Sequence, residues 1–446
     1  MRKTGLAVLG LCVALAVAGC GSQPAAIEQA AAGPAAPDDI SAPGYVPPAY
    51  AYPSVTATAP GTGPASGTNS GAGAGAGAGA GTAAGTTSGT TDNSTGSGGS
   101  SAEGSGAASG LVNNSGAERD CFTKAPGANL SQCDLSGKNL SRAHLTKADL
   151  SNTKLTKAKL TGARLSNANL TNADLTDADL TGANLTGANL TGAVLTGTKL
   201  PGTILVGTKL KGLALTHVSL AGADLSEANL VGADLTESDL TQANLTKANL
   251  TRANLTKATL LRANLTGATL VKATLAKADL TKAKLTKADL TEAQLPEATL
   301  VKAVLKKADF TKAVITKADL TKANLLLAVL TEADLTESTL VGANLTKAIL
   351  TKAILAKSHA SKAVLLAADL TKADLTRADL TQADLAGANL KDADLTEADL
   401  RGADFTEASL VGARLKDAKL KDTIFTSTKW TDGSRCSATP PPGSCR

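Results

Sequence analysis

Large apolar residues recur at every fifth position over most of the chain. Stepping by five from residue 130 to residue 430 gives 61 positions without an insertion or deletion, and 55 of them are Leu. The exceptions are Phe310, Ile315, Ala360, Phe405, Phe425 and Trp430. Two residues before these centres the residue is Ala in 48 units, and the other three positions are mostly polar. Each unit therefore offers one large and one small apolar residue to a core.

A period of five excludes a regular helix and a regular strand. An α-helix turns about 100° per residue, so the Leu drifts by about 140° per unit and no apolar stripe forms. In a strand, an odd period sends every second Leu to the opposite face. The chain must therefore turn a corner after each unit, and internal repeats at a fixed period are typical of solenoids.

The repeat unit resembles the motif A(D/N)LXX of the pentapeptide-repeat family, for example in "ADLTKADLTRADLTQADL" from Ala368 to Leu385. The resemblance covers roughly residues 128–430. It implies an all-β fold, a right-handed quadrilateral parallel β-helix with four pentapeptides per coil, so that residues twenty apart stack. Gly in "TGANL" suits the positive φ of a type II turn, where many units have Lys instead. About fifteen coils, about 4.8 Å apart, would form a filled rod roughly 70 Å long.

Two stretches depart from the repeat. Between Thr196 and Leu220 the inward Ala is replaced by Thr198, Thr203, Thr208, Leu213 and Val218. Because these residues are larger than Ala, we expect the coil to widen there. Between Ala356 and Leu365 the central residue is Ala360, which predicts a small cavity or a dented side. Neutral drift in a redundant array is the simpler interpretation of both stretches.

The first 118 residues predict export and a tether. Arg2 and Lys3 precede an apolar run that ends at Ala18, so residues 1–19 are typical of a signal peptide. The sequence Val17-Ala18-Gly19-Cys20 resembles a bacterial lipobox, which implies lipid attachment at Cys20. The alternative is an ordinary signal peptide in which Cys20 has no role. Residues 20–118 are low-complexity Ala, Gly, Ser, Thr and Pro, which predicts a flexible, disordered linker.

The predicted β-helix with its N-terminal cap occupies residues 119–430, and residues 431–446 form a C-terminal cap or tail. Cysteines lie at both ends. Cys121 and Cys133 precede most of the repeats, while Cys436 and Cys445 follow them. In an exported domain such local pairs predict two disulfides. Cys133 also occupies an inward Ala position, where a buried free thiol would fit. Trp430 is expected to cover the end of the core.

No combination of residues typical of catalysis is present. His144, His217 and His359 lie several coils apart, and none has a Cys or a second His at metal-ligand spacing. Asp374 would stack over Asp394, but these residues lack the Gly-rich pattern of calcium β-rolls. The sequence therefore predicts no enzymatic activity, no cofactor and no metal site.

The charge of the repeats is informative. The whole chain has a net charge of +5, whereas residues 119–446 have 42 basic and 33 acidic groups, a net charge of +9. Members of the resembled family that protect topoisomerases mimic DNA with acidic rods, so the basic charge and the signal peptide both disfavour that function and intracellular DNA or topoisomerase partners. One column of basic residues would stack without any acidic neighbour, and Lys284 would lie beside it. The candidate polyanion-binding residues are therefore Lys284 and the four members of this column: Arg262, Lys282, Lys302 and Lys322. A solvated Lys side is the alternative.

These features predict a non-enzymatic lipoprotein that is lipid-anchored at the cell membrane and extracytoplasmic, at the cell envelope or surface. Its rigid rod would have a structural or interaction role, with an anionic envelope polymer or a protein as its partner. A second hypothesis is binding to an ordered lattice of ice or glycan, because Thr after most centres would form regular columns. Lys and Asp interrupt those columns, which disfavours this second hypothesis.

Overall fold

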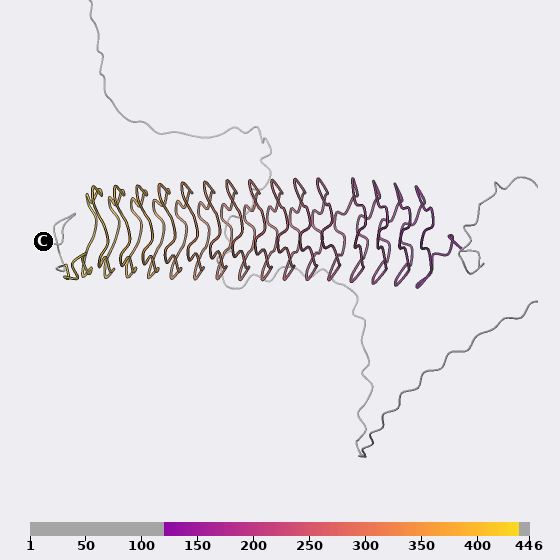
Figure 1. Ribbon diagram of the computed structural model, residues 1–446, viewed down its shortest axis with the longest axis horizontal. Coiled ribbons are helices and arrows are strands. Elements are labelled where there is room, and N and C mark those ends of the chain that lie inside the picture. The colour runs from indigo at the N-terminus through magenta and orange to yellow at the C-terminus, as the bar shows by residue number, and fades with distance from the viewer. Residues whose placement is uncertain (1–119, 437–446) are drawn as a thin grey trace, which may run out of the picture. The chain divides into compact units, whose positions relative to one another are not determined.

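The computed structural model describes residues 120–436, which form one continuous stack of coils (Figure 1). The predicted signal peptide, Cys20, the linker and Cys445 lie outside these residues. Within the described range there is no helix and no strand of several residues. Each five-residue unit instead contributes a two-residue turn and a single bridge residue. Parallel bridges join residues twenty apart, from Asn129↔Asp149 to Ser409↔Lys429.

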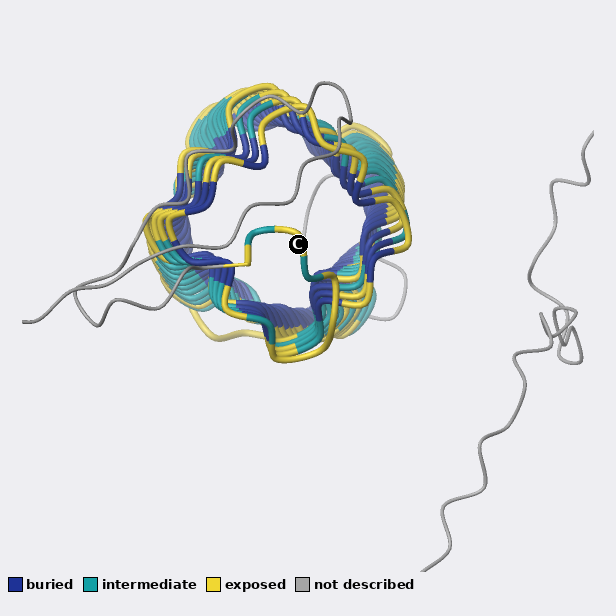
Figure 2. Cartoon of the chain, turned by 90° about the vertical axis from the view of Figure 1, so that its right-hand side faces the viewer, coloured by how far each residue is buried: buried dark blue, intermediate teal, exposed yellow. Residues whose placement is uncertain are grey.

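Hydrogen bonds between neighbouring coils hold the stack together. The amide of Leu250 donates to the carbonyl of Thr269 at 2.7 Å, and the amide of Asn254 donates to that of Ala233 at 2.9 Å. Each coil is thus bonded to the coil before it and the coil after it. The step of twenty residues means four pentapeptides per coil, as predicted, and the end-on view in Figure 2 shows the four sides.

Every corner of the square is a tight turn. At one corner the amide of Ala253 donates to the carbonyl of Leu250 at 2.9 Å, and Arg252 between them has a φ of 58°. A positive φ at the second turn residue fits the predicted type II geometry. Lys282 adopts a φ of 59° at the same position of its unit, against 67° for Gly187. A side chain in this conformation costs about 1–2 kcal/mol, so each Lys corner is retained at a cost that Gly would avoid.

The interior of the stack is closed. Leu250 and Ala248 are both fully buried, as are nearly all of the equivalent Leu and Ala residues. Figure 2 shows buried residues lining the inner surface of each coil and exposed residues along the corners. Each buried Leu contributes roughly 1.5–3 kcal/mol before chain entropy is subtracted. Because one large and one small residue from nearly every unit point inward, the core fills along its length.

Where larger residues replace Ala, neighbouring coils lose hydrogen bonds to each other, while the predicted widening of the coil itself stays a prediction. Thr198, Thr203 and Thr208 are buried, and their hydroxyls donate to backbone carbonyls of the preceding coil at 2.9–3.1 Å. Among the described residues, the amides of Gly192, Leu195 and Gly197 donate no hydrogen bond to the next coil.

Val194 also has no bridge to Ala214. We attribute this gap to Leu213, whose larger side chain occupies the inward position next to Ala214. Figure 1 shows the wider spacing in the magenta part of the rod.

The second irregular stretch keeps a closed core. Ala360 is 2% exposed, and the neighbouring centres Leu355 and Leu365 are equally buried. Ser358, at the inward small position of the same unit, has the one buried side-chain polar atom without a hydrogen-bond partner in residues 120–436. The predicted cavity or dent at Ala360 stays a prediction, while Ser358 marks an additional local defect.

At each end of the stack, residues outside the regular repeat pattern pack against the core. Cys121 and Cys133 form the predicted disulfide, with a Cα–Cα distance of 5.7 Å, and Cys133 is fully buried at its inward position. The alternative of a free thiol at Cys133 is therefore wrong. At the other end Trp430 packs edge-on against Phe425, with ring centroids 5.0 Å apart, and is partly exposed. Cys436 is buried and disulfide-bonded, but its predicted partner Cys445 lies outside the described residues.

Candidate anion-binding side of the rod

The four basic residues of the predicted column occupy the same corner in successive coils. Arg262, Lys282 and Lys302 each donate a backbone hydrogen bond to the next coil at 2.9–3.0 Å, and Lys322 continues the series. All four have a φ of 56–59°, in the left-handed region, and all four side chains are exposed. The turn geometry therefore directs the column of charges away from the core.

Lys284 lies on the side of the square that begins at this corner. Its bridges to Asn264 and Val304 place it in the middle of that side, between two neighbouring coils. The structure thus brings Lys284 together with the corner column, as the sequence predicted. It also shows that the column is one edge of a larger basic surface.

We call this surface the basic side. It consists of the equivalent segments of six consecutive coils: residues 262–267, 282–287, 302–307, 322–327, 342–347 and 362–367. These segments contain ten basic residues and no Asp or Glu. The sequence reasoning missed half of them: Lys287, Lys306, Lys307, Lys347 and Lys362. The same step of twenty residues, applied to the next corner and to the turn position before it, would have found most of them.

None of the ten basic residues forms an ion pair with another residue of the described range. Their charged groups are also not hydrogen-bonded to other described residues, and all ten side chains are exposed. Along the corner, like charges recur at each coil, about 4.8 Å apart in the backbone. This spacing is shorter than the Debye length of about 8 Å at physiological salt, so the charges repel one another.

The opposite side of the same coils is arranged differently. Here Lys and Glu alternate along the two corners, so that a residue finds its opposite charge one coil away. Lys272 lies 3.3 Å from Glu292, and Lys277 lies 3.5 Å from Glu297. Glu332 is paired on both sides, with Lys312 at 3.8 Å and Lys352 at 3.2 Å. The cations of this opposite side are therefore largely neutralised by glutamates of the rod itself.

The paired corners extend beyond these coils. Lys257 donates a hydrogen bond of 3.0 Å to Glu237, which lowers the pKa of that carboxyl, and His217 lies on its other side at 3.4 Å. Arg377 donates a bidentate pair of hydrogen bonds to the carboxylate of Glu397, at 2.8 and 3.1 Å. Exposed pairs of this kind contribute little to stability, because solvent and salt screen them. Their importance here is the contrast with the ten cations of the basic side, which have no such ion pairs.

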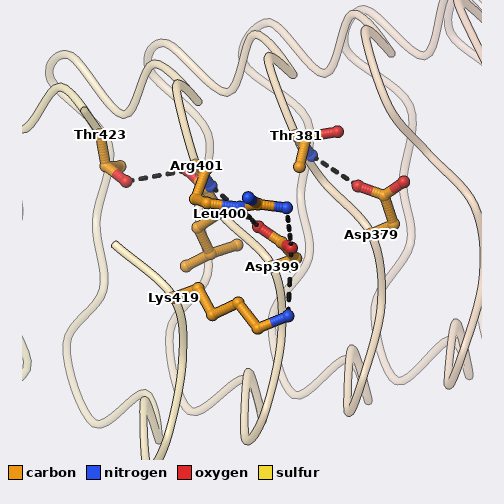
Figure 3. Close-up of polar contacts among 7 residues, drawn as sticks. All are labelled: Asp379, Thr381, Asp399, Leu400, Arg401, Lys419 and Thr423. Atoms are coloured by element: carbon orange, nitrogen blue, oxygen red, sulfur yellow. Dashed lines mark hydrogen bonds and ion pairs between the residues drawn. The ribbon is translucent and has the colours of Figure 1, made fainter. Parts of the chain in front are cut away.

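Near the C-terminal end, two basic residues share one carboxylate. Figure 3 shows Arg401 stacked beside Asp399, to which it donates hydrogen bonds of 2.8 and 2.7 Å. Lys419 reaches the same carboxylate from the next coil at 3.4 Å. The bonds from Arg401 hold the pKa of Asp399 below its ordinary value. Both cations of this cluster contact a carboxylate, unlike the cations of the basic side.

The carboxylates nearest to the basic side belong to the two adjoining sides. Asp279 and Asp289 each accept a hydrogen bond from the backbone amide of the Thr two residues later, at 2.9 and 3.0 Å. Asp309 and Asp319 do the same at 2.9 and 2.8 Å. These acids are held at the turns of their own sides, and they weaken the positive potential without pairing with the ten cations.

The described residues contain no group of three or more His, Cys, Asp or Glu that could hold a metal ion. Asp374 bridges to Asp394 as predicted, in a shallow depression of about 470 Å³, but Arg414 lies 3.5 Å from Asp394 and neutralises it. A search of the same residues for a helix long and apolar enough to cross a membrane also found none.

Comparison with known proteins identifies the class of this chain. A family model described as pentapeptide repeats (8 copies) matches overlapping segments from residue 127 to residue 426, apart from residues 287 and 326–327. Because the matches cover well over half of the sequence, the chain belongs to the pentapeptide-repeat family. Members of this family fold into right-handed quadrilateral β-helices, and the four-sided coils described above are that fold.

Several proteins of known structure are similar to this chain. HetL, a pentapeptide repeat protein involved in heterocyst differentiation regulation from Nostoc sp. strain PCC 7120, is 34% identical over 51% of this chain and 92% of its own, with a TM-score of 0.28. Rfr23 from Cyanothece 51142 is 36% identical over 22% of this chain and 63% of its own, with a TM-score of 0.18.

QnrB1, a plasmid-mediated fluoroquinolone resistance protein, is 20% identical over 38% of this chain and 90% of its own, with a TM-score of 0.23. This likeness concerns the fold alone. A search of curated proteins found no match to the chain.

Proposed function

We propose that this chain is a non-enzymatic lipoprotein that is anchored to a membrane through Cys20 and presents its rod on the extracytoplasmic side. The observation that carries the proposal is the order of three features in one chain. An apolar segment ends in Val17-Ala18-Gly19-Cys20, a linker of small and polar residues follows, and an unbroken rod begins near residue 120.

The physical properties of each part support this order. A single acyl chain gives only marginal membrane binding, whereas the lipid of a bacterial lipoprotein supplies several chains on one residue. The linker consists mainly of Ala, Gly, Ser, Thr and Pro, a composition typical of tethers. The rod itself is closed, with Leu and Ala filling its interior, so its function must lie on its outer surface. Pentapeptide repeat proteins are generally non-enzymatic, which agrees with this interpretation.

The anchoring is tested by replacing Cys20. The Cys20→Ala variant should no longer incorporate labelled palmitate, and its share in the membrane fraction should fall. Cys12→Ala is the matched control, because Cys12 lies inside the predicted signal peptide and its loss should change neither result. If Cys20→Ala stays in the membrane fraction and keeps the label, Cys20 is not the anchor and the proposal fails.

A further inference from the structure

We infer that the basic side is a docking surface for a membrane rich in anionic lipid, so that the rod lies with this side against the headgroups. The inference goes beyond the proposed anchor and does not depend on lipid attachment at Cys20. It rests on two features of the same side: ten unpaired cations, and a set of exposed apolar residues among them.

The cations are spread over an area. They lie on two corners and on the side between them, across six coils, and the repeating backbone makes this side regular and flat. A planar array of phosphate headgroups is complementary to such a surface, because many headgroups are contacted at once. Basic residues next to an anionic membrane each add about fivefold to binding at low salt. The opposite side, with its ion pairs, lacks this property.

Apolar residues gather at one corner of the basic side. Leu327 and Leu366 are 38% and 37% exposed, and Leu326 lies beside Leu327 at the same turn. Ile349, on the adjoining side, is 42% exposed one coil further on. Most units have Thr, Lys or Gly at these turn positions, so the Leu residues depart from the repeat. Lys322, Lys347 and Lys362 lie in the same and neighbouring coils.

This combination distinguishes a membrane from a soluble polyanion. Binding to DNA or to a wall polymer depends on counterion release and is lost as salt rises, and exposed Leu side chains add nothing to it. A surface with cations around apolar side chains binds anionic membranes through electrostatic attraction and also through burial of apolar area, since the apolar groups enter the headgroup region. The Leu residues among the cations therefore favour a lipid surface.

The test uses the full chain in a Cys20→Ala background, so that lipid attachment plays no part. Co-sedimentation with vesicles of phosphatidylcholine alone measures any binding by the N-terminal apolar segment. Vesicles that also contain phosphatidylglycerol measure the added effect of anionic lipid. Three further variants are compared by circular dichroism, to confirm folding, and then in both vesicle types at low and high salt.

The first variant replaces four cations of the basic side by Gln: Lys282, Lys302, Lys307 and Lys322. The matched control replaces four cations at equivalent corners of the opposite side: Lys272, Lys277, Lys312 and Lys317. Both remove the same charge. The basic-side variant should lose at least about tenfold of its binding to anionic vesicles at low salt, while the control should lose much less. Equal losses would show that only net charge matters, which would overturn the inference.

The third variant exchanges apolar residues for types that the repeat tolerates: Leu326→Thr, Leu327→Asn and Leu366→Thr. It should lose the binding that remains at high salt and keep most of the binding at low salt. Double-stranded DNA is the competing probe. If DNA binds as tightly as anionic vesicles, and if the apolar variant leaves vesicle binding unchanged, the side is a site for soluble polyanions and the lipid inference is wrong.

Because Cys20 is absent throughout, a negative result here leaves the palmitate-labelling test of anchoring unaffected. If the rod docks as inferred, part of the Cys20→Ala variant stays with membranes, so incorporation of the label decides whether Cys20 is the anchor.

Discussion

Replacing Ser358 by Ala should make the rod more stable. Ser358 is fully buried at an inward position that Ala occupies in most units, and its hydroxyl has no hydrogen-bond partner among the described residues. Burying an unpaired hydroxyl costs about 1–3 kcal/mol, and Ala removes this cost with a loss of only one atom from the core. The free energy of unfolding of this part of the stack should therefore rise by about 1–2 kcal/mol.

Ser338, one coil earlier in the same column, provides the matched control. Its hydroxyl donates to the carbonyl of Leu335 at 2.7 Å, so Ser338→Ala removes a made hydrogen bond. The carbonyl of Leu335 still accepts from the amide of Ser338 at 3.0 Å, so no buried group is left unpaired. The control should be close to neutral or destabilising by about 1 kcal/mol.

Native-state hydrogen exchange is the suitable assay, because each coil contacts only its neighbours and a global melting curve averages over local openings. The amides of His359 and Ala360, which donate to Ser338 and Asp379, report on the affected coils. Their exchange in Ser358→Ala should slow by about 5–30-fold. If exchange is unchanged or faster, or if both variants behave alike, the hydroxyl of Ser358 has a partner in solution and the reasoning is wrong.

Two further predictions concern the open coil and the C-terminal ion pair. Leu213→Ala should let the neighbouring coils close, so the amide of Leu195 should gain a hydrogen bond and exchange more slowly; unchanged exchange would show that Leu213 does not hold the gap open. The pKa of Asp399 is lowered mainly by Arg401, so its ionised form stabilises the folded chain above the unfolded pKa of about 3.9, and this contribution is lost as pH falls further. Asp399→Asn should therefore be less stable near neutral pH and should match the original chain in acid, as measured by denaturant unfolding across pH; a constant difference would contradict this.

Much of the candidate site was accessible from the sequence once the step of twenty residues was accepted. That step places Arg262, Lys282, Lys302 and Lys322 in one column, and the structure agrees. The remaining cations were missed because attention stayed on one corner, although Lys287 and Lys307 are also twenty residues apart. The unpaired hydroxyl of Ser358 was not predictable, because Ser238 and Ser338 at equivalent positions do find acceptors.

The sequence by itself determined that the chain turns a corner after every unit, since neither a helix nor a strand can bury a residue at a period of five. It did not determine how many corners close one coil, which came from the family resemblance. The tertiary structure sets the number of corners at four, because the hydrogen bond from the amide of Leu250 to the carbonyl of Thr269 belongs to a coil of twenty residues.

The consequence for the surface is large. In a coil of fifteen residues Lys282 would lie beside Glu297, and Lys322 beside Glu337, so the basic side would not exist. With twenty residues per coil the same glutamates pair with Lys277 and Lys317 on the opposite side, at 3.5 and 3.8 Å. Which charges are neutralised is thus set by contacts between coils, because electrostatic pairing depends on which side chains the stacking brings within reach.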